Sequence, residues 1–112
     1  LSNWQRQSEK SYRYGIAQTC FLRSLDMLKL FMRARAEHGF RLTNILREAS
    51  FICDELKILL RLAKDTRGLS LKHFIQLQKA LQEIGKQLGG WIKANMPDTK
   101  RPAASAQGDG GM

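Results

Sequence analysis

The chain has 112 residues, enough for one domain, and its 43% hydrophobic and 26% charged residues are typical of a folded protein rather than a disordered one. Nineteen Lys and Arg residues against ten Asp and Glu give a net charge of +9 at pH 7, which favours a polyanionic partner. Lys or Arg interrupts every apolar run before the roughly 20 residues of a membrane span, and residues 1–15 lack the apolar centre of a signal peptide. We therefore expect a cytoplasmic protein with no membrane contact.

The residue types that carry most enzyme and metal chemistry are sparse. Cys20 and Cys53 stand at apolar positions of helical patterns without partners at metal-ligand spacing, so we expect buried thiols in a reducing compartment. His38 and His73 each stand alone, which favours solvated or capping roles. Phosphate-binding glycine loops, nucleophile elbows and metalloprotease motifs are all absent. The sequence predicts a protein that is not an enzyme and that needs no cofactor or metal.

Proline is absent before Pro97 and valine is absent altogether, whereas helix-forming residues dominate. This composition predicts an all-α fold, an antiparallel up-down helical bundle over residues 1–96. Residues 97–112 read as a disordered tail with as many acidic as basic residues, so the whole net charge belongs to the bundle. The predicted helices cover about residues 1–14, 16–37, 42–66 and 70–95.

Residues 1–14 are polar and aromatic, and we predict that they are the end of an earlier helix that breaks at Gly15. The next predicted helix is amphipathic, has basic residues on its outer surface and is closed by Gly39. Its apolar set, expected to face the core, comprises Ala17, Cys20, Phe21, Leu25, Leu28, Phe31 and Met32.

Apolar residues step by three and four through residues 42–66, forming a coiled-coil-like seam. Phe51 and Ile58 lie off this seam among polar neighbours, so we predict that they contact another subunit. Gly68 is predicted to take the left-handed conformation that ends the helix. The opposing face contributes the candidate nucleic-acid-binding residues Arg47, Lys57, Arg61 and Lys64.

Ser70 is placed to cap the last helix, in which lysines recur every seven residues and form a ridge with a spacing of about 10 Å. A solvated polar face is the alternative interpretation, but only Glu83 offsets these charges, which favours phosphate binding. Gly85 and Gly89, four residues apart, would let a neighbouring backbone approach closely, although a frayed or kinked helix end would also explain them. The lysines of the ridge are Lys72, Lys79, Lys86 and Lys93.

The segment Leu81-Gln-Glu-Ile-Gly-Lys-Gln-Leu-Gly-Gly-Trp-Ile-Lys93 resembles the last helix of four-helix-bundle proteins related to the 23S rRNA intervening-sequence proteins. Within that group the chain looks most like the accessory variability determinants (Avd proteins) of diversity-generating retroelements. The stretches 45–50 and 56–62 and the short loop before Ser70 add to the resemblance, which covers about residues 16–95.

The resemblance implies a non-enzymatic protein that forms a ring-like homopentamer with a basic surface. Such proteins bind RNA and DNA with little sequence preference and associate with a reverse transcriptase, supporting mutagenic copying of a template. Lys57 and Arg61 correspond to basic positions of the family. The family has a full first helix, whereas here only residues 1–14 precede the second one, so the bundle is expected to have a shortened or missing first helix.

Two other functions remain open at this point. A ribosome-associated bundle of the rRNA intervening-sequence type would share the fold without a reverse-transcriptase partner. A structural helical adaptor would use its lysines for solubility alone. A helix-turn-helix regulator is less favoured, because the predicted helices are long and their connections do not resemble the short turn of that motif.

Overall fold

The computed structural model describes residues 2–96, which form three α-helices and, within that span, no strand. They are α1 (Asn3–Ala34), α2 (Gly39–Asp65) and α3 (Leu71–Ala94). The expectation of an all-α fold is confirmed. The part of the chain described here has three helices rather than four, and the predicted tail at 97–112 lies outside it.

The predicted break at Gly15 is wrong, because α1 continues through it as one helix of 32 residues. A single helical glycine costs only about 1 kcal/mol relative to alanine, and the flanking hydrogen bonds continue across it. The start of α1 is fixed by a capping box in which the Ser2 hydroxyl accepts from the backbone N–H of Gln5 at 3.2 Å. The Ser-x-x-Gln spacing of this box was already present in the sequence.

The connections between helices also differ from the expectations. Gly39 does not close the preceding helix but begins α2, with a φ of 64° that glycine adopts without steric cost. At the end of α2 the left-handed residue is Arg67 rather than Gly68. Thr66 is the C-cap, and the N–H of Gly68 donates to Ala63 O at 2.8 Å, which completes a Schellman motif. The helix therefore ends one residue earlier than the glycine suggested.

The predicted cap of the last helix is confirmed, since the Ser70 hydroxyl accepts from the N–H of His73 at 3.2 Å. The other end of α3 is tied to the beginning of α2 through Asn95. Its side-chain amide donates to Gly39 O at 2.9 Å and to the Thr43 hydroxyl at 2.8 Å. These bonds join the end of α3 to the beginning of α2, as in an antiparallel pair of helices.

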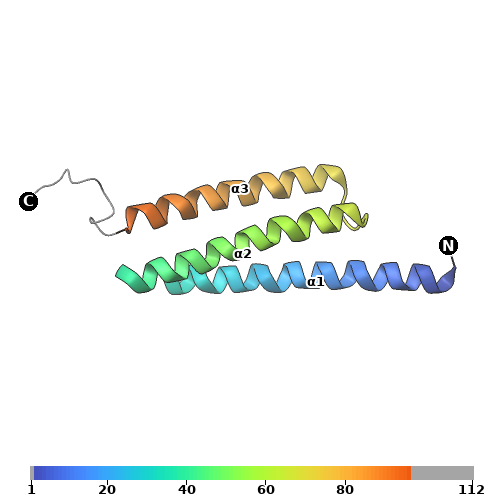
Figure 1. Cartoon of the computed structure of the whole chain (residues 1–112), viewed down its shortest axis with the longest axis horizontal. Coiled ribbons are helices and arrows are strands. Elements are labelled where there is room, and N and C mark those ends of the chain that lie inside the picture. The colour runs from blue at the N-terminus through green and yellow to red at the C-terminus, as the bar shows by residue number, and fades with distance from the viewer. Residues whose placement is uncertain (1, 97–112) are drawn as a thin grey trace, which may run out of the picture.

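α2 lies between α1 and α3, which each pack against it and not against each other (Figure 1). The seam predicted on α2 supplies most of the core, and its centre is completely buried. Contact with a helix on each flank explains why α2 has more buried residues than α1 or α3. The core comprises Met27, Leu30 and Ala34 of α1, Leu42, Ile45, Leu46, Ala49, Ile52, Cys53 and Leu56 of α2, and Leu81 and Leu88 of α3.

The face of α1 that contacts α2 is not the one the sequence suggested. Ile16, Met27, Leu30 and Ala34 are buried, and only Cys20 and Phe31 of the predicted apolar set pack against the core. The rest of that set is exposed. α1 has two apolar faces, and periodicity alone does not say which one meets a neighbouring helix.

Among residues 2–96, no helix is long and apolar enough to cross a membrane.

Candidate nucleic-acid interface

The four lysines that recur along α3 all lie on its solvent-exposed side. Across the described residues 2–96, none of their ammonium groups lies within 4.0 Å of a carboxylate. Because α3 is one uninterrupted helix, the seven-residue interval keeps the four lysines on the same side of it, as predicted. Exposed cations without carboxylate partners are available to bind phosphate groups.

The basic residues of α2 divide into two kinds. Arg47 and Arg61 are exposed, and no carboxylate of the described chain pairs with them. Lys57 has a carboxylate neighbour in Asp54, with Nζ and Oδ1 3.8 Å apart, and Lys64 has one in Asp65 at 3.6 Å. Both pairs are solvent-accessible and long, so they weaken the local positive potential only slightly.

Lys57 and Lys64 reach the boundary between α2 and α3. The ammonium of Lys57 is 3.6 Å from the point that a Cβ would occupy at Gly85, and that of Lys64 lies 4.7 Å from the centre of the Phe74 ring. Arg61 stands four residues after Lys57 and three before Lys64, so all three share one side of α2. The basic side of α2 thus meets α3 near Gly85 and Phe74, whereas the lysine ridge lies on the side of α3 that is turned away from α2.

The four predicted oligomer contacts have different environments. Phe51 and Ile58 are 65% and 69% exposed, as their position off the seam requires. A Cβ at Gly85 would meet side-chain atoms of Lys57 and Cys53 at ordinary contact distances, and a Cβ at Gly89 would meet nothing within 4 Å. Among residues 2–96 neither glycine serves a close approach of two backbones, so their proposed role concerns a second copy only.

A second exposed apolar surface, which we did not anticipate, runs along α1. Its members are spaced by four, three and four residues and lie roughly opposite the face that contacts α2. These residues belong to the apolar set that we expected to face the core. Their spacing identifies an apolar face of the helix, but it does not say which element packs against that face. This α1 stripe consists of Phe21, Leu25, Leu28 and Met32, which are 62%, 37%, 54% and 64% exposed.

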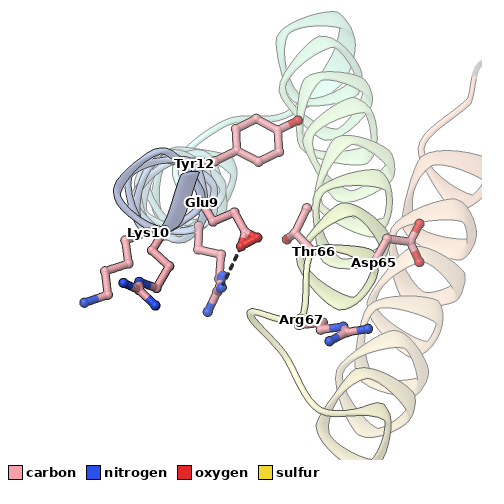
Figure 2. Close-up of a pocket in the computed structure, with 8 residues that line it drawn as sticks. Glu9, Lys10, Tyr12, Asp65, Thr66 and Arg67 are labelled. Carbon is pink, nitrogen blue, oxygen red and sulfur yellow. Dashed lines mark ion pairs between the residues drawn. The ribbon is translucent and has the colours of Figure 1, made fainter. Parts of the chain in front are cut away.

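A cluster of cations at the N-terminal end of α1 was not predicted from the sequence. A shallow depression of about 520 Å³ lies between this part of α1 and the α2–α3 turn (Figure 2). Arg6, Lys10 and Arg13 step by four and three along α1, a spacing that could have revealed them as one face. Arg67, in the α2–α3 turn, also lines the depression, although it lies more than fifty residues after Arg13 in the sequence. The depression is further lined by Glu9, Tyr12, Asp65 and Thr66.

Cys20 is half-buried and Cys53 is buried, and the two histidines stand at the beginnings of α2 and α3. Burial raises the pKa of both thiols, and at Cys53 the nearby Lys57 ammonium partly opposes this shift. His38 is the N-cap residue of α2 without a side-chain capping bond, and His73 Nδ1 lies 2.9 Å from the Ser70 hydroxyl. No group of three His, Cys, Asp or Glu side chains between residues 2 and 96 is arranged to hold a metal ion.

No protein-family model, curated protein or solved structure matches this chain.

Proposed function

We propose that this chain is a non-enzymatic, sequence-nonspecific nucleic-acid-binding protein that acts as an accessory factor of a diversity-generating retroelement. The observation that carries the proposal is the ridge of four exposed lysines on α3, which have no carboxylate partner among residues 2–96. The basic side of α2 supplies further cations. Backbone phosphates are the ligands that such a surface suits, because a row of flexible ammonium groups recognises charge rather than base edges.

Binding by one protomer would be weak, since only a few phosphates could be neutralised at a time. Self-association would repeat the basic surface and raise the overall affinity through avidity. Phe51, Ile58 and the α1 stripe supply exposed apolar area for such contacts. Of the two glycines proposed to contact a second copy, Gly89 is exposed on α3 and Gly85 stands at its boundary with α2. Following the resemblance, we propose a cytoplasmic ring-like pentamer that binds RNA, DNA and a reverse transcriptase.

The experiment that tests the proposal is a fluorescence-anisotropy titration of RNA and DNA oligonucleotides at several salt concentrations. We expect the logarithm of the affinity to fall linearly with the logarithm of salt concentration, with similar slopes for unrelated base sequences. Replacing the four ridge lysines with Gln should reduce both the affinity and the slope.

The matched control replaces four other exposed cations with Gln and so removes the same charge: Lys29, Arg33, Arg35 and Arg41. If both quadruple variants lose affinity equally, net charge rather than the α3 ridge causes the binding. If the unmodified chain does not bind at about 0.15 M salt, the adaptor function replaces the proposal. Native mass spectrometry tests the assembly, and a monomer at micromolar concentration would contradict the ring.

A further inference from the structure

The first third of α1 is an arm that projects past the α2–α3 turn (Figure 1). Every side chain from Ser2 to Tyr12 is exposed, so this arm does not contribute to the core. It nevertheless carries large aromatic rings, with Trp4 76%, Tyr12 54% and Tyr14 69% exposed. Aromatic rings without a packing role, interleaved with cations, are typical of surfaces that bind single-stranded nucleic acid.

The rings and the cations of the arm are arranged next to each other. Trp4 and Tyr12 line one shallow depression on the arm, and Tyr12 also lines the larger one that contains Arg13 and Arg67. The aromatic ring of Tyr12 therefore separates a surface suited to a base from one suited to a phosphate. Figure 2 shows Lys10 pointing away from α2, which places its ammonium at the rim of this region.

The guanidinium group of Arg13 has a hydrogen-bond donor without a partner among the described residues. Its ion pair with Glu9 is long, at 4.0 Å between Nη2 and Oε1, and its buried Nε has no hydrogen-bond partner in the described part of the chain. A buried donor without a partner is unfavourable unless a ligand or water satisfies it. An anionic oxygen is the acceptor that a guanidinium N–H prefers.

Arg67 reaches the same depression from a strained backbone position. Its φ of 63° is in the left-handed region, which favours glycine or asparagine, yet an arginine occupies it. The Schellman motif that ends α2 requires this conformation at its C′ position, where glycine or asparagine would cost less than arginine. An arginine is therefore kept beside the depression, at a place where local stability favours another residue.

We infer that the arm of α1 and the α2–α3 turn together form a site for single-stranded RNA or DNA. Bases stack on Trp4 and Tyr12, and a backbone phosphate enters the depression between Arg13 and Arg67. Double-stranded nucleic acid fits this site poorly, because its base faces are already stacked on one another. The inference rests on the proposed function and adds to it the strandedness of the ligand, since the lysine ridge alone would bind either form.

Tryptophan fluorescence gives a direct readout of stacking. Trp91→Phe leaves Trp4 as the single tryptophan, and this variant is titrated with a 20-nucleotide oligo-dT strand and with a duplex of equal length. We expect the single strand to quench Trp4 emission and the duplex to leave it nearly unchanged. In the unmodified chain, Trp4→Ala with Tyr12→Ala should weaken oligo-dT binding by about tenfold without changing duplex affinity. Phe40→Ala, which removes a ring that is 80% exposed outside the arm, is the matched control.

Arg67→Asn separates a ligand-binding role from a structural one. Asparagine tolerates the left-handed backbone but carries no charge, so this variant should fold more stably and yet bind oligo-dT several-fold less tightly. If Arg67→Asn changes stability alone, and the Trp4/Tyr12 variant binds both ligands normally, the inference is overturned while the proposed function stands.

Two other outcomes would lead to different conclusions. If the unmodified chain binds neither oligo-dT nor duplex at about 0.15 M salt, the proposed function fails together with the inference. Vesicles containing phosphatidylserine test the competing membrane ligand. A blue shift and enhancement of Trp4 emission with these vesicles, without quenching by oligo-dT, would show that the arm binds an anionic lipid surface and would overturn the inference.

Discussion

The ammonium group of Lys57 on α2 lies 3.6 Å from the point where a Cβ atom would stand on Gly85 of α3. The same lysine accepts a hydrogen bond at its backbone carbonyl from Gln78 Nε2 at 3.0 Å. One residue thus takes part both in the packing of two helices and in the basic surface above them. Substitutions of Lys57 and its neighbours can therefore show whether a loss of nucleic-acid affinity comes from the lost charge or from a loss of stability.

We predict that Lys57→Ala combined with Arg61→Ala weakens RNA and DNA binding together. Two cations of α2 are lost, so the slope of log affinity against log salt concentration should decrease by about two, or somewhat less for single strands. Anisotropy titrations give the slope, and circular dichroism should show unchanged helicity. Asp54→Asn should have the opposite effect on affinity. It removes the carboxylate next to the Lys57 ammonium and should therefore strengthen binding. Unchanged affinity in the double variant would exclude this side of α2 from the interface.

Gly85→Ala and Gly89→Ala should each increase the stability of the folded protomer. A Cβ at Gly85 would stand 3.6 Å from Lys57 Nζ and 3.9 Å from Cys53 Sγ, which are ordinary contacts, and the Gly89 position is open. Removing a helical glycine should then contribute about 0.5–1 kcal/mol, measurable by urea denaturation.

The same two substitutions test the proposed contact with a second copy. If these glycines admit a neighbouring backbone, the added methyl groups should reduce the oligomer mass observed by light scattering while the protomer becomes more stable. A stabilised protomer with an unchanged oligomer would remove Gly85 and Gly89 from the interface.

Leu28 and Leu30 of α1 should respond very differently to alanine substitution. Leu30 is 4% exposed, so Leu30→Ala should cost about 2–5 kcal/mol of unfolding free energy. Leu28 is 54% exposed on the α1 stripe, and its substitution in dilute solution should change stability by about 0.5 kcal/mol or less. Chemical denaturation at two protein concentrations checks both values. A large loss for Leu28→Ala only at the higher concentration would place the α1 stripe in a contact between chains.

Cys53 should make the stability of the fold depend on pH in the alkaline range. Burial raises its pKa in the folded state, so its stabilising effect is complete below the pKa of the unfolded thiol and is lost as pH rises through the folded pKa. Thermal unfolding from pH 7 to pH 10 should show this decline. The decline should be smaller in Cys53→Ala, which also loses the contact of Sγ with Leu81 O at 3.3 Å.

Thiol labelling of the native protein complements this test. Cys53 is 1% exposed and should react with an aromatic disulfide reagent only on unfolding, whereas Cys20 is partly exposed and should react first. Equal rates for the two thiols would show that α2 and α3 separate readily.

Local patterns in the sequence determined the parts of this protein that depend on one helix at a time. The helical class, the seam of α2, the cap at Ser70 and the exposure of Phe51 and Ile58 follow from spacing and intrinsic preference. The lysine ridge of α3 was predictable for the same reason, because a seven-residue interval keeps side chains on one side of a helix.

Only the tertiary structure decided which helix surfaces meet. α1 is apolar on two faces, and the choice of the face with Leu30 over the face with Leu28 depends on the shape and position of α2. The continuity of α1 through Gly15 depends on the sum of helical hydrogen bonds, which outweighs the small cost of one glycine. Arg13 and Arg67 line one depression because the α2–α3 turn lies beside the N-terminal half of α1, and residues so distant along the chain share no local pattern that could predict this.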